Sequence, residues 1–114
     1  MEFDSNKPIY LQIADRLCDR ILREELKAGD RLPSVREYGA EIGVNPNTVA
    51  RTYETLTDQG VIYNKRGIGF FVAENAARNI RAEAKEKFLK EDLPNFANKA
   101  RLLAIDKDEI MKLL

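Results

Sequence analysis

Apolar residues recur at spacings of three and four near the start of the chain, and this periodicity predicts an amphipathic helix. The inward positions are Tyr10, Ile13, Ala14, Leu17, Cys18 and Ile21. Pro8 suits the first turn, because the N–H group that proline lacks would have no partner there. The helix is therefore expected from about Pro8 to Glu24, ahead of a turn at Gly29-Asp30 and a short extended step at Leu32-Pro33.

Two further helices are predicted by the residues that cap them. Ser34 and Glu37 form the sequence pattern of a capping box, in which each side chain bonds the backbone N–H of the other residue. Gly43 then fits the left-handed position that ends a helix. Asn45 caps the next helix, with Pro46 in its first position. Two short helices joined by so tight a turn must cross steeply, which is the geometry of a helix-turn-helix.

The third helix is expected to run to Gln59 and to stop at Gly60. Its periodicity divides it into an apolar face and a polar face. The apolar face, which should be buried, consists of Val49, Tyr53 and Leu56. The outward face consists of Asn47, Ala50, Arg51 and Glu54.

A β-hairpin is predicted after the three helices. Residues 61–65 and 70–72 are rich in β-branched and aromatic residues, and the glycine-punctuated segment 66–69 separates them. The hairpin would cover the open side of three helices that are too short to close a core by themselves. The predicted fold class is therefore α+β, mainly helical, with an N-terminal winged helix-turn-helix domain over residues 1–73.

Residues 74–114 are expected to form a short helical tail. Pro94 interrupts the helical pattern, so we expect a break or sharp kink near Asp92, and Asp106 with Glu109 starts a last short helix. The tail carries an apolar stripe that includes Ile80, Ala84, Phe88, Leu93, Phe96, Ala100 and Leu103. The stripe either folds back over the winged helix or packs against a second copy of the chain. We favour the second copy, because exposed apolar stripes of this length mark association.

The composition argues against most catalytic mechanisms and most metal sites. The chain of 114 residues contains no His and a single Cys. It therefore has no imidazole for acid/base or nucleophilic catalysis and no mixed Cys/His set for zinc. Segment 66–69 is too short for a dinucleotide-binding fingerprint. We expect no enzyme activity, no metal and no cofactor.

The sequence also indicates a cytoplasmic protein without membrane contact. Its first seven residues include acidic side chains where a signal peptide has a basic region and then an apolar one. No apolar run approaches the ~18 residues that cross a bilayer.

Net charge does not point to a nucleic-acid partner, since Lys plus Arg and Asp plus Glu both number 19. The case for DNA depends on position. Asn47 and Arg51 lie one turn apart on the outward face of the third helix, and these residue types pair with adenine and guanine in the major groove. Lys65 and Arg66 lie beside glycines at the hairpin tip, which suits contact with phosphates or the minor groove.

The start of the second helix adds a further candidate contact. Ser34 and Arg36 lie at the positive end of the helix dipole, which favours a phosphate. Each candidate also has a structural alternative. Ser34 and Asn45 are above all helix caps, and Arg51 suits a solvated helix surface about equally well.

Five motifs follow one another in a specific order and spacing. They are Pro8-Ile9-Tyr10-Leu11-Gln12-Ile13, Gly29-Asp30-Arg31-Leu32-Pro33-Ser34-Val35-Arg36-Glu37, Gly43-Val44-Asn45-Pro46-Asn47-Thr48-Val49, Gly60-Val61-Ile62 and Gly67-Ile68-Gly69-Phe70-Phe71-Val72. Over about residues 8–72 the chain resembles the GntR family of bacterial transcription regulators. The Asn-Pro-Asn-Thr-Val start of the third helix and the short tail resemble its YtrA subfamily. Members of that subfamily lack the large ligand-binding domains of other GntR proteins and look like dimeric repressors, often of operons that encode ABC transporters.

The resemblance implies a set of DNA-contacting residues. They are Arg36, Asn45, Pro46, Asn47, Thr48, Arg66 and Gly67. This chain departs from the family at two positions. Many GntR proteins have Arg where Ala50 stands, and here the cation is one residue later, at Arg51. The apolar Ile68 occupies the middle of the tip of the predicted hairpin, which is the wing of the winged helix. Lys65 and Arg66 are left to supply the charge of this tip.

The predicted function is a homodimeric, sequence-specific regulator of transcription, a repressor by resemblance, that binds double-stranded DNA at a palindromic operator. A second hypothesis is a winged-helix module that binds another protein without specific DNA binding, and the neutral net charge favours it. The fold leaves room for a small-molecule effector between winged helix and tail, and no residue identifies one.

Overall fold

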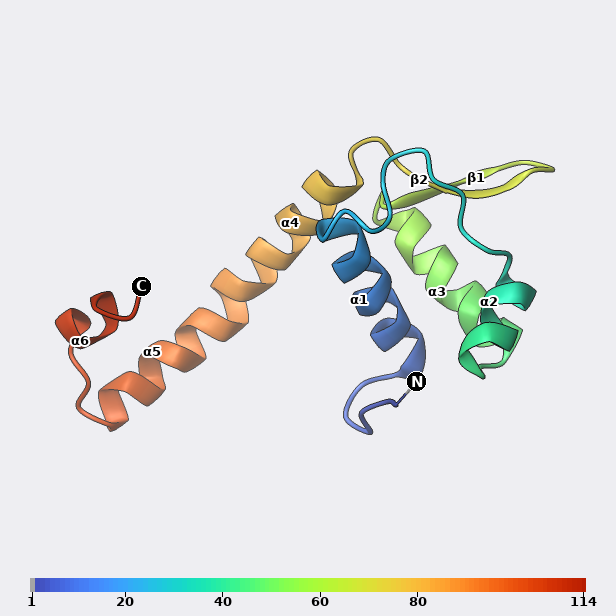
Figure 1. The fold of residues 1–114 in the computed structure, drawn as a ribbon. Helices are drawn as coiled ribbons and strands as arrows, with labels where there is room; N and C mark the ends of the chain where they lie inside the picture. Colours follow the sequence, from blue (N-terminus) through green and yellow to red (C-terminus); the bar gives the residue numbers. More distant parts are fainter. Residues whose placement is uncertain (1) are drawn as a thin grey trace. The chain divides into compact units, whose positions relative to one another are not determined.

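The computed structural model describes residues 2–114, which form a mainly helical fold with a two-stranded sheet (Figure 1). The elements are α1 (Ile9–Leu22), α2 (Val35–Ile42), α3 (Pro46–Asp58), β1 (Ile62–Lys65), β2 (Gly69–Val72), α4 (Ala76–Lys87), the π-helical turn η1 (Phe88–Asp92), α5 (Leu93–Leu102) and α6 (Lys107–Met111). The chain divides into two compact units, and the boundary lies between Ile80 and Arg81.

The core of the first unit joins all three N-terminal helices to the hairpin. The predicted faces of α1 and α3 are confirmed: Ile13 and Leu17 are buried in α1, and Val49, Tyr53 and Leu56 are buried in α3. The core also takes in the first turns of α4, through two further apolar side chains. These are Ala76 and Ile80.

The helix-turn-helix is bounded by the caps that the sequence predicts. The Ser34 hydroxyl accepts from the Glu37 N–H at 3.1 Å, and the Glu37 carboxylate accepts from the Ser34 N–H at 3.2 Å. These hydrogen bonds lower the pKa of Glu37 below its usual value. Gly43 ends α2 in the left-handed conformation at φ 72°, and the Asn45 side chain accepts from the Asn47 N–H at 2.8 Å.

Gly39 lies inside α2, where glycine is a poor helix former. A Cβ atom at this position would lie 2.6 Å from the Val44 carbonyl oxygen. The Val44 N–H also donates to the Gly39 carbonyl at 2.8 Å. Glycine therefore lets the turn between α2 and α3 close directly onto α2, a tertiary reason that helical periodicity does not reveal.

The hairpin is tied to the loop that precedes α2. β1 and β2 pair antiparallel, with Ile62 opposite Val72 and Lys65 opposite Gly69. The loop then adds backbone hydrogen bonds to the other edge of β2, from the Leu32 N–H to the Phe70 carbonyl at 2.8 Å and from the Gly29 N–H to the Val72 carbonyl at 2.9 Å. The sequence predicted the extended step at residues 32–33 but not its pairing with the wing.

The expected break near Asp92 does not occur. The backbone stays helical at Asp92 (φ −71°, ψ −43°) and at Leu93 (φ −67°, ψ −45°). The Leu93 N–H donates to the carbonyl of Phe88, five residues earlier, which makes the wider π-turn. In a regular helix the ring of Pro94 would clash with the carbonyl four residues before it, and we attribute its accommodation to this wider turn.

Candidate nucleic-acid interface

Helix α3 is anchored from its buried face by two side-chain hydrogen bonds. The Thr52 hydroxyl donates to the Tyr10 carbonyl of α1 at 2.8 Å, and the Tyr53 hydroxyl donates to the Pro33 carbonyl at 2.7 Å. The Tyr53 ring also meets the edge of the Phe70 ring in β2, at a centroid distance of 4.9 Å. α3 is thereby connected to α1, to the loop before α2 and to the hairpin, which determines the face it turns outward.

The outward face of α3 is as predicted. Asn47, Ala50, Arg51 and Glu54 are all exposed. The Arg51 guanidinium is not extended freely into solvent, because its Cζ atom lies 4.1 Å from the centroid of the Tyr10 ring. This contact is a cation–π interaction between α3 and the first turn of α1.

The N-termini of α2 and α3 meet at an open concavity of about 560 Å³ on the surface of the first unit. Its lining consists of Val35, Arg36, Asn45, Pro46, Asn47 and Ala50. The structure therefore brings Arg36 to the same surface as the start of α3, as the sequence argument required. Both helices have their positive dipole ends here, which favours an anion such as a phosphate.

The wing presents its predicted cations on an ordered tip. Lys65, Arg66 and Gly67 are exposed, and Gly67 adopts φ 78°, which favours glycine. The Lys65 ammonium lies 5.8 Å from the centroid of the Phe71 ring. Ile68, which is 52% exposed, forms part of the tip between these cations and β2.

Arg31 was not singled out by the sequence argument, and it holds the wing tip in place. Its Nη2 donates to the Ile68 carbonyl at 3.0 Å. A Cβ atom at Gly69 would lie 3.1 Å from the Arg31 Nε atom, so glycine gives the guanidinium room to lie against β2. The Gly67-Ile68-Gly69 spacing was the available signal that another group lies close to the backbone here. The sequence does not say which side chain fills the space beside Gly69.

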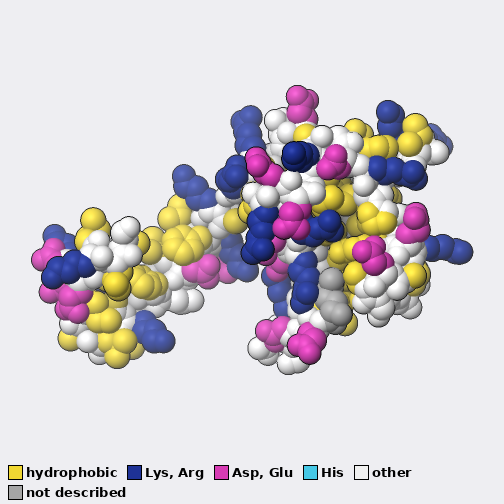
Figure 2. All heavy atoms as spheres, in the orientation of Figure 1, with side chains coloured by type: hydrophobic (Ala, Val, Ile, Leu, Met, Phe, Trp, Pro, Cys, Tyr) yellow, Lys and Arg dark blue, Asp and Glu magenta, His cyan; other side chains and the backbone are white. Residues whose placement is uncertain are grey.

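On the face that Figure 2 presents, Lys and Arg side chains are mixed with Asp and Glu side chains and do not form one basic field. Among the described residues, the ion pairs join Lys7 to Asp15, Arg20 to Glu25 and Lys90 to Glu86. The cations of the candidate interface take part in none of these pairs. They are Arg36, Arg51, Lys65 and Arg66.

The second unit exposes most of the apolar stripe predicted for dimerisation. Phe88 is 50% exposed, Phe96 52% and Leu103 61%, while Ala84 and Leu93 are also exposed and Ala100 is half-buried. Ile80 differs, since it is only 8% exposed and belongs to the core of the first unit. Its burial leaves it little surface to offer a partner.

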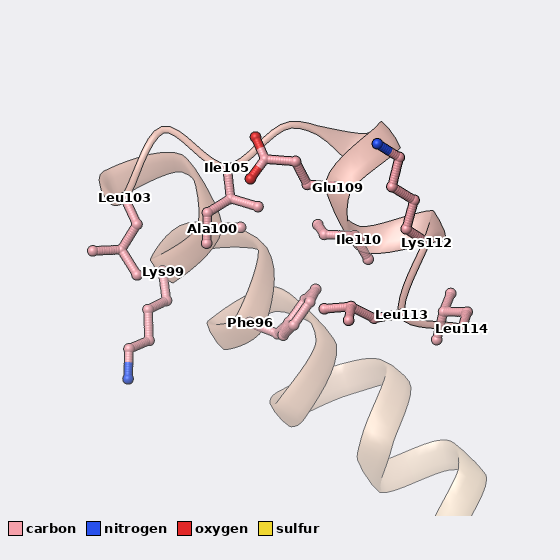
Figure 3. A pocket seen from close by; sticks show the side chains of 10 residues that line it. All are labelled: Phe96, Lys99, Ala100, Leu103, Ile105, Glu109, Ile110, Lys112, Leu113 and Leu114. Carbon is pink, nitrogen blue, oxygen red and sulfur yellow. The ribbon is translucent and has the colours of Figure 1, made fainter.

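A groove of about 590 Å³ lies between α5 and α6. Figure 3 shows Phe96 from α5 beside Leu113, with Ile110 of α6 lining the same groove. The Asp106 side chain accepts from the Glu109 N–H at 2.9 Å and caps α6, which confirms the predicted last helix. The tail therefore carries a largely apolar groove, which Lys99, Glu109 and Lys112 also line.

The described residues give no geometry for a metal centre. No group of three or more His, Cys, Asp or Glu side chains among residues 2–114 is arranged to hold a metal ion. Within the same range, none of the helices has the length and apolar character needed to cross a membrane.

Sequence comparisons relate the chain to bacterial regulators. Residues 9–72 match the family profile of bacterial regulatory proteins, gntR family. YhcF of Bacillus subtilis, an uncharacterized HTH-type transcriptional regulator, is 44% identical over 97% of this chain and 90% of its own length. YtrA of B. subtilis, an HTH-type transcriptional repressor, is 36% identical over 93% of this chain and 81% of its own length.

Solved structures share the fold. The crystal structure of a GntR-family transcriptional regulator from Bacteroides thetaiotaomicron has a TM-score of 0.80 at 52% identity, over 92% of this chain and 91% of that one. AraR(DBD) in complex with operator ORX1 has a TM-score of 0.59 at 25% identity, over 63% of this chain and 93% of that one. The winged helix-turn-helix predicted from the sequence is confirmed.

Proposed function

This chain belongs to the GntR family of bacterial regulatory proteins, and we propose that it is a homodimeric repressor that binds a palindromic operator. Members of this family are DNA-binding transcription regulators and not enzymes. The observation that carries the proposal is the exposed polar face of α3. That face adjoins the concavity where the N-termini of α2 and α3 meet.

In the proposed complex, α3 enters the major groove. Asn47 and Arg51 then face base edges or the adjoining backbone, as Asn and Arg do in direct readout. Arg36 and the α3 start at Asn45, Pro46 and Thr48 approach phosphates, supported by the two helix dipoles. The caps keep their structural role. At α2 the Ser34 hydroxyl accepts from the Glu37 N–H, which leaves the N–H groups of Val35 and Arg36 to donate to a phosphate. At α3 the Asn47 and Thr48 N–H groups already donate to Asn45, so the helix dipole and the side chains supply the support there.

The wing supplies the second contact. Lys65, Arg66 and Gly67 lie along the backbone or in the minor groove, and the hydrogen bond from Arg31 to the Ile68 carbonyl keeps the tip ordered. An ordered tip loses less conformational entropy on binding than a mobile one.

Dimerisation is assigned to the tail, residues 74–114, and DNA binding to residues 1–73. The support is the set of large apolar side chains that η1, α5 and α6 expose, among them Phe88, Phe96 and Met111, because clustered exposed apolar residues mark association. A pair of copies related by a two-fold axis would present two α3 helices to two half-sites, which requires an operator with matching symmetry.

Similarity to YtrA, a transcriptional repressor, supports placing the chain among the short, YtrA-like members of the family and supports a repressor's role. The target that we propose, a transporter operon, follows from the resemblance to that subfamily. The place of action is then the bacterial cytoplasm, where the operator DNA lies.

Affinity selection of fragmented genomic DNA tests the proposal. The purified protein is mixed with fragments at near-physiological salt, because nonspecific binding depends steeply on salt. Recovery of a palindromic motif is the expected result, and its half-site spacing measures the separation of the two α3 helices. A folded protein that recovers no motif would contradict the proposal and favour the protein-interaction module.

Lys65→Ala should weaken binding to all DNA sequences alike. A wing cation that contacts a phosphate releases about one counterion, so its loss lowers the slope of log affinity against log salt by about 1. The measurement is a salt titration of operator and random duplexes. Lys85→Ala, an exposed cation of α4, is the matched control and should leave the slope unchanged. Equal slopes for Lys65→Ala and the unmodified protein would place the wing away from the phosphates.

A further inference from the structure

The contact between Arg51 and Tyr10 links the DNA-facing surface of α3 to a helix that itself carries no predicted DNA contact. The Arg51 Cζ atom lies 4.1 Å from the Tyr10 ring centroid. The backbone at Tyr10 is held against α3, because the fully buried Thr52, next to Arg51, donates its hydroxyl to the Tyr10 backbone carbonyl at 2.8 Å. The Tyr10 ring and the Arg51 guanidinium therefore extend from backbone positions that are fixed relative to each other.

Stacking leaves the hydrogen-bonding edge of a guanidinium available. An aromatic ring contacts the flat face of the group, whereas its five N–H donors point outward in the plane. Arg51 is exposed, and no ion pair among residues 2–114 engages it. A long arginine side chain otherwise loses much rotamer freedom when it binds, and a stacked one has already lost part of it.

We propose that Tyr10 is a positioning residue for operator binding, which holds the Arg51 guanidinium with its donors toward DNA. The inference builds on the proposed function, since it concerns the same α3 surface. It accounts for the position of the arginine on α3, which stands one residue later than in many GntR proteins. Arg51 stands one residue after Ala50 and so points about 100° further around the helix, toward α1, where Tyr10 receives it.

The acceptor for Arg51 is an oxygen or nitrogen on DNA, either a guanine edge or a phosphate. The two differ in measurable ways. A guanine contact makes Arg51→Ala relax the preference at one base pair of each half-site, whereas a phosphate contact lowers the salt slope by about 1 and leaves the preference unchanged.

A double-mutant cycle tests the positioning role. Tyr10→Leu should weaken operator binding about three- to tenfold, the range expected when one long side chain must lose its rotamer freedom on binding. Tyr10→Phe keeps the ring and should bind within about twofold of the unmodified protein. In an Arg51→Ala background, Tyr10→Leu should have almost no further effect, because the side chain that Tyr10 positions is gone. Thermal unfolding of each variant shows that it is folded.

Nuclear magnetic resonance of the free protein tests the contact without DNA. The Arg51 Cζ atom lies over the Tyr10 ring, so the Arg51 side-chain protons nearest to the guanidinium should be shifted upfield in the unmodified protein and in Tyr10→Phe, but not in Tyr10→Leu. Identical Arg51 resonances in all three proteins would overturn the proposal. So would additive effects of Tyr10→Leu and Arg51→Ala, and so would an equal loss of affinity in Tyr10→Phe and Tyr10→Leu, which would assign the effect to the hydroxyl.

Failure of the proposed function gives a different result. The unmodified protein would then select no operator at all, while the Arg51 resonances would still report whether the ring holds the guanidinium. If the unmodified protein selects an operator but Tyr10 and Arg51 show no energetic coupling, the positioning role of Tyr10 is rejected and the proposed function stands.

Discussion

Replacing Phe96 by aspartate should convert the proposed dimer into monomers and weaken operator binding by about 100-fold or more. Phe96 is 52% exposed and lines the apolar groove between α5 and α6. A carboxylate there would have to leave water when a second copy covers the surface, and an unpaired buried charge is strongly unfavourable. Two linked half-site contacts gain about 10²–10⁴ in affinity over one, and a monomer loses that gain.

Sedimentation and DNA titration measure the two consequences of Phe96→Asp separately. The matched control is Asn95→Asp, which adds the same charge to the neighbouring exposed position of α5. Asn95→Asp should remain dimeric with unchanged affinity. Because Phe96 is exposed in the single chain, the variant should retain its helix content. A dimeric Phe96→Asp protein, or monomers of the unmodified chain at micromolar concentration, would refute dimerisation through this surface.

The helix boundaries of the first unit were predictable because residues close to each boundary determine them. Ser34 with Glu37, Gly43 and Asn45 act within four residues of their own positions, and each makes the contact that its residue type favours. The inward face of α3 followed in the same way from spacing alone. Local chemistry and the global fold agree at these positions, which is typical of a sequence that specifies one structure.

The contacts that position the candidate interface were not predictable, because their partners are far apart in the sequence. Arg31 meets the Ile68 carbonyl 37 residues later, and Thr52 meets the Tyr10 carbonyl 42 residues earlier. Periodicity says which way a side chain points but not which distant group it meets. Of the break or sharp kink expected near Asp92, the break was wrong for a related reason. The π-turn before Pro94 keeps the backbone helical, and residue type does not predict that turn.

The tail shows a further limit of periodicity. Ile80 and Phe96 lie on one predicted stripe, yet the structure buries Ile80 in the first unit and leaves Phe96 exposed. The apolar stripe therefore has two structural roles, one in its first part and another in its later part. Its start fastens α4 to the winged helix, helped by the hydrogen bond from the Asn79 side chain to the Gly60 carbonyl at 2.8 Å. Only the later part is available to a second copy.

Tyr53→Ala should lower the free energy of unfolding by about 3–5 kcal/mol, the range for deleting a large buried aromatic side chain. Tyr53 is fully buried, stacks at 6.5 Å from Tyr38 and contacts the Phe70 ring, so its loss opens a cavity where α2, α3 and the wing meet. The midpoint of thermal unfolding should fall by more than about 10 °C. DNA binding should fail with folding, since the same ring fixes the outward face of α3.

Tyr53→Phe isolates the hydroxyl, and its effect should depend on pH. The variant leaves the Pro33 carbonyl without its donor, which costs about 1–3 kcal/mol at neutral pH. Burial raises the pKa of Tyr53 well above its usual value, so the fold holds the protonated form. The unfolded chain ionises this tyrosine from about pH 10 upward. The folded protein keeps the proton there, and the stability contributed by Tyr53 therefore falls as pH rises past that point.

Denaturant unfolding at several pH values measures this difference. Above about pH 10 the unmodified protein should lose up to about 1.4 kcal/mol more per pH unit than Tyr53→Phe, which corresponds to one proton. Tyr38, whose pKa is also raised by burial, titrates in both proteins and cancels in the comparison. Parallel pH curves would show that the Tyr53 hydroxyl is not held protonated against the Pro33 carbonyl. The anchoring of α3 to the loop before α2 would then depend on ring packing alone, and Tyr53→Phe should bind the operator as tightly as the unmodified protein.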